Sequence, residues 1–309
     1  MKLHSFTGLL FMLGLLMIFS GLVFFRSEDF KTLINTYFSE NRKIVLDSKN
    51  EYYRDYDFIF VKNTDSFSPR SQQDMLNIYY TVINAGKDEF TFYCPKEYEA
   101  CLTDVQDLAN NQDLLSEINN YVHPFNGFSH IATEYDNLGK VTIRIEKTYS
   151  EEDIKKVSDK VNALYPQLVN NNLSTIDNIR NIHDFIINNT EYDSARSDLG
   201  DTTYPSDTAM GPLFYGYGIC GGYTDLMELF LEKMNIKSFK VSSDLHVWNA
   251  VFLDNKWYHL DLTWDDPVSE DGKNYLQYNY FLIDTNKLLE TEMTEHDFII
   301  DNYPELKVA

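Results

Sequence analysis

Cysteine and positive charge are both scarce in this chain of 309 residues. Its three cysteines, Cys94, Cys101 and Cys220, include no CxxC pair, so the sequence lacks the spacing of a cysteine-based zinc site. The 26 lysines and arginines are outnumbered by 48 aspartates and glutamates, which leaves a formal net charge of −22. A protein this acidic is not attracted to nucleic acid or to an anionic lipid surface, so we expect no nucleic-acid partner.

The chain also has no internal repeat and no low-complexity tract. Hydrophobic residues make up 43% of it, which is enough for a buried core, and aromatic residues make up 15%, which suits domains that contain strands. The length is typical of about two domains.

An uncharged segment near the N-terminus is long enough to cross a membrane. Residues 5–25 would span roughly 31 Å as a helix. Lys2 precedes the segment and Arg26 follows it, but Glu28 and Asp29 come directly afterwards, so the charge bias only leans towards an N-terminus inside the cell. No small-residue cleavage motif ends the segment, so we expect an uncleaved single-pass anchor with the rest of the chain outside the cell. A cleaved signal peptide and a secreted protein are the alternative.

An extracellular location permits a disulfide bond. Cys94 and Cys101 lie seven residues apart and could close one small loop, which would leave Cys220 as the single reduced thiol. Two free, partly buried cysteines are an equally good interpretation of the same pair.

After the anchor segment, residues 1–27, we expect a stalk at 28–50 and a small α+β domain of unknown role at 51–149. Within that domain the pattern predicts a helix over 71–84, a strand over 90–94, one or two helices within 96–121, and a hairpin formed by 128–135 and 140–148.

A second domain is predicted over residues 150–309. Ser150 and Ser174 have the sequence context of helix N-caps, and Pro166 is expected to bend or end the first of the two helices. The second helix has an apolar stripe of Ile176, Ile179, Ile182 and Ile186. His183 lies near this stripe, where a packed histidine is a better interpretation than a ligand. Residues 191–218 read as a long irregular segment, a common place for functional residues.

Cys220 is surrounded by glycines and precedes a helical pattern of Tyr223, Leu226, Met227, Phe230 and Met234. It is therefore predicted at or beside a helix N-terminus, where partial positive charge and free N–H groups favour a thiolate and can stabilise an oxyanion. Gly221 and Gly222 would let a substrate backbone approach closely. The alternative is a small buried residue that happens to be cysteine.

The segment HVWNAVFLDNKWYHLDLTWDDP, residues 246–267, alternates on both sides of Asp254-Asn255 and predicts a hairpin with a two-residue turn. In that register Trp248 faces Asp261, so His246 and Asp261 are diagonal neighbours on one face. An imidazole and a carboxylate placed in this way can form a hydrogen bond that fixes the tautomer of the histidine.

Other residues of the hairpin allow competing interpretations. His259 lies on the same face and is the rival base, while Trp248 is expected to form a wall of the site and Trp257 to belong to the core. A metal site made of Cys220, His246, His259 and Asp261 has only a weak signal, because the spacing is loose. We therefore expect no metal and no cofactor.

These motifs together resemble the bacterial transglutaminase-like superfamily over about residues 175–285. The shared pattern is a cysteine in a glycine-rich helix start, then His-x-Trp-Asn 26 residues later and Asp261 15 residues after His246. The resemblance implies an α+β papain-like core, with the cysteine helix packed on an antiparallel sheet. It also implies Cys220 as nucleophile, His246 as general base and acid, Asp261 as the residue that orients His246, and a thioester intermediate.

The resemblance implies a cysteine protease, an amidase or a cross-linking enzyme that acts on peptide, amide or isopeptide bonds. The expected substrate is a protein or peptide of the cell envelope, and the membrane is contacted through the N-terminal helix. Hydrolysis is favoured over transamidation because water is always present. The alternatives are an inactive cell-surface binding module on the same fold and a scaffold protein.

Overall fold

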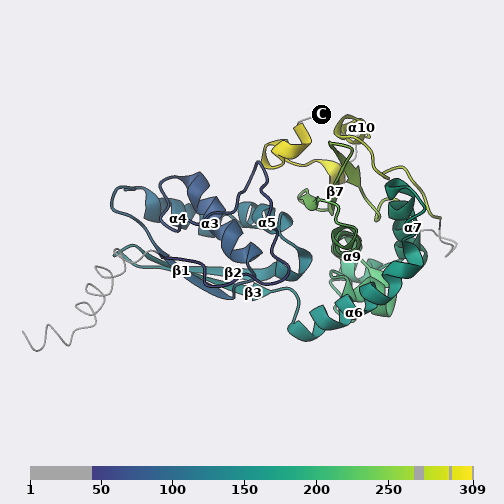
Figure 1. Cartoon of the computed structure of the whole chain (residues 1–309), viewed down its shortest axis with the longest axis horizontal. Coiled ribbons are helices and arrows are strands. Elements are labelled where there is room, and N and C mark those ends of the chain that lie inside the picture. Colours follow the sequence, from purple (N-terminus) through teal and green to yellow (C-terminus); the bar gives the residue numbers. More distant parts are fainter. Residues whose placement is uncertain (1–43, 268–274, 292–293, 308–309) are drawn as a thin grey trace, which may run out of the picture.

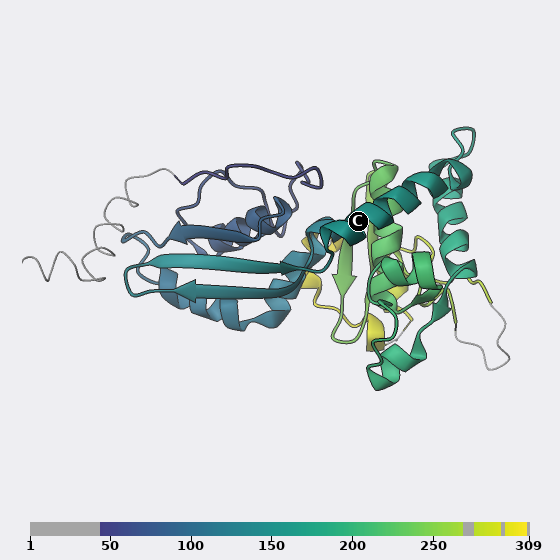
Figure 2. The ribbon, with the colours of Figure 1, turned by 90° about the horizontal axis from the view of Figure 1, so that it is seen from below.

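The computed structural model describes residues 44–267, 275–291 and 294–307 as two lobes that lie side by side (Figures 1 and 2). The predicted membrane anchor, within residues 1–27, lies outside the described residues. None of the helices in the described part is long and apolar enough to cross a membrane.

The first lobe is a three-stranded antiparallel sheet in the order β1-β3-β2, with helices α3, α4 and α5 along one face (Figure 1). Its elements are α3 (Gln72–Asn84), β1 (Glu89–Tyr93), α4 (Cys101–Asn110), α5 (Gln112–Asn120), η1 (Pro124–Asn126), β2 (Phe128–Tyr135) and β3 (Lys140–Lys147). Ser71 caps α3 by accepting a hydrogen bond from the Asp74 amide. These elements confirm the helices and the hairpin predicted for this stretch, and Cys94 and Cys101 are joined by a disulfide.

The second lobe begins with two capped helices. α6 (Glu151–Leu168) follows Ser150, and α7 (Thr175–Asn188) follows Ser174. Pro166 lies inside the last turn of α6, which ends two residues later. Ile176 is exposed, so the apolar stripe of α7 begins at Ile179 rather than at Ile176.

The remaining elements place the cysteine helix against a sheet of order β6-β7-β8. They are β4 (Glu191–Tyr192), α8 (Ser194–Leu199), η2 (Gly211–Tyr215), β5 (Tyr217–Gly218), α9 (Cys220–Lys233), β6 (Ser238–Ser242), β7 (Val247–Leu253), β8 (Lys256–Leu260), α10 (Thr285–Leu289), η3 (Thr294–His296), η4 (Ile300–Asn302) and η5 (Pro304–Lys307). The segment 191–218, read from the sequence as irregular, thus contains short helices and a two-stranded parallel pair.

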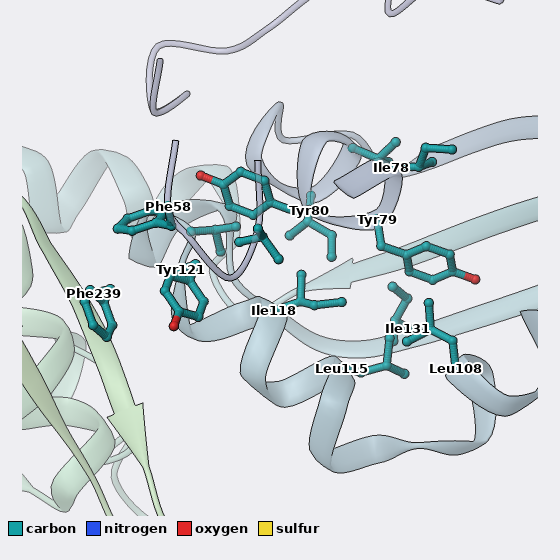
Figure 3. Close-up of a cluster of buried hydrophobic side chains, with 14 of the residues drawn as sticks. Phe58, Ile78, Tyr79, Tyr80, Leu108, Leu115, Ile118, Tyr121, Ile131 and Phe239 are labelled. Atoms are coloured by element: carbon teal, nitrogen blue, oxygen red, sulfur yellow. The ribbon is translucent and has the colours of Figure 1, made fainter. Parts of the chain in front are cut away.

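The sheet β6-β7-β8 is a shared middle layer, because its two faces belong to different apolar clusters. Val251 and Leu260 pack with α7 and α9, whereas Trp248 and Ala250 pack in the cluster that also holds the first lobe. Figure 3 shows Phe239 of β6 beside Tyr121 and Phe58 of the first lobe, and the Phe239 and Tyr121 rings stack 4.9 Å apart. The lobes therefore bury apolar surface against each other, while the proposed domain boundary near residue 150 stays a prediction.

A buried ionic contact also joins the lobes. Arg54 of the first lobe is 3% exposed and lies 2.6 Å from Glu228 and 2.7 Å from Glu232, both on α9. Arg54 also donates to the Tyr121 carbonyl at 2.9 Å. The cysteine helix is thereby held on the first lobe by charge as well as by apolar packing.

Candidate functional site

Cys220 is the first residue of α9, as the sequence pattern predicts. The preceding Ile219 has extended backbone, and its amide donates to the Ser206 carbonyl at 2.8 Å, which fixes the point where the helix begins. Of the chain's three cysteines, Cys220 is the one outside the disulfide, and it is partly exposed. The helix start directs partial positive charge towards this side chain.

Gly221 and Gly222 allow a close approach of backbone, and this chain itself makes the approach. A Cβ on Gly221 would lie 2.6 Å from the Asp207 carbonyl oxygen, and one on Gly222 would lie 2.3 Å from the Ser206 carbonyl oxygen. The start of α9 is thus packed directly on the segment 206–208. Side chains at the two glycines would separate these parts of the site.

The hairpin that carries the other two candidates has the predicted register. Leu253 pairs with Lys256 and Ala250 with His259 across a two-residue turn. The turn residues Asp254 and Asn255 have φ values of 48° and 65°, the backbone that tight hairpins of this length require. The predicted placement of His246 and Asp261 on one face follows from this register.

The structure brings His246 and Asp261 into direct contact: His246 Nε2 lies 2.6 Å from Asp261 Oδ2. Both side chains are almost fully buried. Burial opposes the charged form of His246, but the Asp261 carboxylate and the nearby Cys220 thiol outweigh it and raise the pKa of His246 to about 10. Burial likewise opposes ionisation of Asp261, yet His246 and a second histidine, His296, hold its pKa below the usual range. The pair is therefore an imidazolium and a carboxylate at neutral pH.

Cys220 is a neighbour of His246, and its interaction with the imidazole contributes to the raised pKa of His246. Because Nε2 of His246 is committed to Asp261, Nδ1 is the ring nitrogen left to exchange a proton with the thiol. The arrangement can thus form a thiolate–imidazolium pair whose histidine is oriented by a carboxylate.

Hydrogen bonds and ring packing hold Trp248 and His259 in place beside His246. The Trp248 ring is buried, stacks on His246 at 5.6 Å, and donates its indole N–H to His259 Nδ1 at 2.9 Å. The other nitrogen of His259 lies 3.1 Å from the Thr285 hydroxyl. Burial lowers the pKa of His259 to about 3, so His259 stays neutral and its acceptor nitrogen is occupied. His246 is consequently the better base of the two.

Two neighbours of the site were not singled out from the sequence. His296, in η3, lies 2.8 Å from the same Oδ2 of Asp261 that His246 contacts. Tyr192, in β4, lies near Cys220, and its pKa is raised by burial and by the charge of that thiol. The proximity of Tyr192 follows from the parallel pairing of β4 with β5, which precedes Cys220. No periodicity or motif marks His296, since it reaches Asp261 through a tertiary contact.

In the part of the chain that the structure describes, the residues placed closely enough to hold a metal ion differ from the set considered on sequence grounds. Among the described residues, ligand atoms of His246, Asp261 and His296 lie within 4.8 Å of one another. Both histidine Nε2 atoms are already within hydrogen-bond distance of Asp261 Oδ2, so these three atoms are occupied by hydrogen bonds to one another. His183, by contrast, is fully buried in the packed face of α7 between Asp184 and Asp265, as expected for a core histidine.

Comparison with known protein families finds a match for one part of the chain. Residues 162–262 match the family model described as the transglutaminase-like superfamily. Similar solved structures include a TGase (TM-score 0.33, 13% identity, covering 44% of this chain and 45% of that one). They also include a provisionally assigned cysteine protease from Cytophaga hutchinsonii (TM-score 0.29, 16% identity, covering 43% of this chain and 61% of that one). The match thus spans about half the length of each of these chains, and no curated protein matches this chain.

Proposed function

Because the chain carries a transglutaminase-like domain at residues 162–262, we propose that it is a thiol enzyme that forms an acyl-enzyme on Cys220. The observation that carries the proposal is the 2.6 Å contact between His246 and Asp261 beside a partly exposed thiol at a helix start. In this proposal Cys220 is the nucleophile, His246 is the acid and base, and Asp261 orients His246.

Acylation begins when the Cys220 thiolate attacks the carbonyl carbon of an amide. A carbon–sulfur bond forms, and the carbonyl electrons move onto oxygen, where backbone N–H groups of the first turn of α9 stabilise the oxyanion. When the carbon–nitrogen bond breaks, Nδ1–H of His246 protonates the leaving amine. The products are a free amine and a thioester on Cys220.

Deacylation decides between two activities. Water or an amine, deprotonated by His246, attacks the thioester carbonyl, and the thiol leaves with the proton. Water gives hydrolysis and an amine gives transamidation. We favour hydrolysis of a peptide, amide or isopeptide bond, since water is always available at a site that is open enough to expose Cys220.

The proposed location is the outer side of the cell membrane, with a protein or peptide of the cell envelope as substrate. The disulfide between Cys94 and Cys101 supports an oxidising compartment. The uncharged segment 5–25 supports an anchor.

The test is the pH dependence of iodoacetamide alkylation at Cys220 in the full-length protein. Since the other two cysteines are disulfide-bonded, the label reports on Cys220 alone. An isolated thiol titrates near ~8.5, whereas a thiolate paired with a histidine at a helix start reacts rapidly down to about pH 4–7. We expect fast alkylation at pH 6 that His246→Ala slows at least about tenfold, and no turnover of peptide substrates in Cys220→Ala.

His130→Ala is the matched control, because His130 is exposed and lies on β2, in the other lobe from Cys220. It should leave the alkylation profile unchanged. A midpoint near the free-thiol value in the wild-type protein, unaffected by His246→Ala, would contradict an assembled pair. That result would favour the alternative of an inactive binding module on the same fold.

A further inference from the structure

His296 contacts the same carboxylate oxygen of Asp261 that His246 contacts. It lies 35 positions after Asp261 in the chain and outside the matched residues 162–262. Its Nε2 is 2.8 Å from Asp261 Oδ2, while Nε2 of His246 is 2.6 Å from the same oxygen. All three side chains are at most 3% exposed.

The hydrogen bonds of Asp261 account for both of its oxygens. Oδ2 accepts from the two histidines, and Oδ1 accepts from the Trp264 amide at 3.2 Å. A buried carboxylate needs such donors, because each missing one leaves charge without compensation. Without His296, Oδ2 would keep a single side-chain donor, and that donor is the histidine that must move protons during the reaction.

The ring of His296 is arranged for this one hydrogen bond. Its Nδ1 is buried without a hydrogen-bond partner among the residues that the structure describes. Its faces and edges contact aromatic rings instead: Trp248 at 5.0 Å and 89°, and Tyr280 at 4.8 Å and 36°. Trp248 in turn stacks on His246. The packing therefore fixes the ring and leaves Nε2–H aimed at Asp261.

The backbone around His296 is tied to the loop that carries His246. The Ser243 hydroxyl donates to the Glu295 carbonyl at 2.6 Å and accepts from the His246 amide at 3.1 Å. Further along the same segment, the Tyr303 hydroxyl accepts from the Ser242 amide at 2.9 Å. The Ser243 hydroxyl thus links the backbone of His246 to the residue that precedes His296.

From this geometry we propose that His296 is a positioning residue for the reaction: its Nε2–H holds Asp261 Oδ2 in line with His246 Nε2. It touches neither the thiol nor the substrate and acts through Asp261. The inference rests on the proposed thiol chemistry, but it concerns a residue beyond the family pattern and gives the C-terminal segment a role in the site.

The experiment compares His296→Phe, which keeps a ring but loses the donor, with His296→Gln, whose side-chain amide can place a donor near the position of Nε2. In the full-length protein, His296→Phe should slow Cys220 alkylation at pH 6 about tenfold and move the pH midpoint towards that of a free thiol, whereas His296→Gln should recover most of the wild-type profile. In an Asp261→Asn background, His296→Phe should add little, since its effect passes through Asp261.

Three results would overturn the proposal: a wild-type profile in His296→Phe, a defect in His296→Gln as large as in His296→Phe, or full additivity with Asp261→Asn. If His296→Phe does not fold, His296→Asn replaces it, because its shorter amide cannot reach Asp261; equal profiles of the Asn and Gln variants then refute the role. The proposed function can fail independently of this inference: alkylation of the wild-type protein that does not depend on His246 would contradict the proposed function.

The role of His296 can then still be measured through the NMR titration midpoint of His246. If His296→Phe leaves that midpoint unchanged, His296 does not position Asp261.

Discussion

His246 and His259 lie on the same hairpin, yet their surroundings act on them in opposite directions. Both are buried, and burial alone lowers the pKa of an imidazole. The Asp261 carboxylate lies against His246 and reverses this effect, so the pKa of His246 rises to about 10. His259 meets an indole N–H and a hydroxyl instead, and its pKa falls to about 3. The contact with Asp261 thus separates a proton carrier from a structural acceptor on one face of the hairpin.

This contrast predicts two titrations far from the ordinary histidine range. In NMR spectra of protein with labelled histidines, His246 should stay protonated through neutral pH and titrate near pH 10, while His259 should stay neutral down to about pH 3. Because the folded pKa of His246 is raised, its protonation stabilises the fold fully below the unfolded value of ~6.5 and this contribution is lost as the pH rises towards 10.

Asp261→Asn provides the matched variant for this titration. Removing the carboxylate should move the His246 midpoint down by more than about one unit. A His246 signal that titrates near pH 6.5 in the wild-type protein would show that the pair is not formed, and would remove the electrostatic basis for the proposed mechanism.

At the scale of elements, the glycines at the start of α9 set the distance between the helix and the segment 206–208. Replacing glycine by alanine inside a helix ordinarily gains about 1 kcal/mol. At Gly222 the new Cβ would lie 2.3 Å from a backbone carbonyl oxygen, which cannot move without shifting its segment. Overpacking of this kind costs about 1–3 kcal/mol, so the clash outweighs the gain in propensity.

A 2.3 Å contact with backbone belongs at the upper end of this cost, about 3 kcal/mol, so after the gain in propensity we predict that Gly222→Ala lowers the free energy of unfolding by about 2 kcal/mol and slows alkylation of Cys220. Urea unfolding measures the first effect and iodoacetamide labelling the second. Gly127→Ala is the control, since its nearest backbone contact would be 3.1 Å and its φ of −62° suits any residue. If Gly222→Ala is as stable as the wild-type protein, the segment 206–208 yields easily and does not fix the site.

Local patterns predicted the elements that carry the site. The serine N-caps of α6 and α7, the helix start at Cys220, and the hairpin turn at Asp254 and Asn255 are all encoded within a few residues. The contact of His246 with Asp261 followed because a two-residue turn determines the register of every pair in the hairpin. The catalytic roles of these residues stay a proposal.

Long-range contacts could not be predicted in this way. His296 reaches Asp261 from a short 3-10 turn with no apolar period, and Arg54 meets Glu228 across 174 residues. Ile176 fits the helical period of α7 but lies beyond the surface that other elements cover, so it is exposed. Such positions depend on how elements pack, and a periodicity in one element contains no information about its neighbour.

At the scale of the whole molecule, the first lobe supports the site through contacts with the C-terminal half of α9. Cys220 lies at the start of this helix, and Glu228 and Glu232, further along it, contact Arg54. A hydrogen bond also joins the first lobe to the C-terminal segment: the Tyr121 hydroxyl donates to the carbonyl of Asn302, which follows His296 in the chain. We therefore expect the two lobes to unfold in one cooperative transition.

Arg54→Met tests this dependence, because it removes the cation from a carboxylate that stays buried. Glu228 is fully buried, and one of its oxygens has no partner among the described residues even with Arg54 present. Breaking a buried pair in this way costs about 3–5 kcal/mol, whereas Arg144→Met, at an exposed pair on the first sheet, should cost at most about 1 kcal/mol.

The cost of Arg54→Met should also depend on pH. Burial already raises the pKa of Glu228 and Arg54 opposes this rise, so the variant raises the pKa of Glu228 further. A carboxyl with a raised pKa destabilises the fold increasingly above its unfolded pKa, and the loss should be larger at pH 8 than at pH 5.

Urea unfolding followed by far-UV circular dichroism reports on both lobes, and tryptophan fluorescence reports on the second lobe, which contains all three tryptophans. The two signals should change at one urea concentration in the wild-type protein, and at one lower concentration in Arg54→Met. Arg54→Met combined with Glu228→Leu should regain most of the stability, since an apolar pair can replace a buried ion pair without loss. If the fluorescence transition keeps its wild-type midpoint in Arg54→Met while the circular dichroism transition splits, the lobes unfold independently, and the first lobe does not support the cysteine helix.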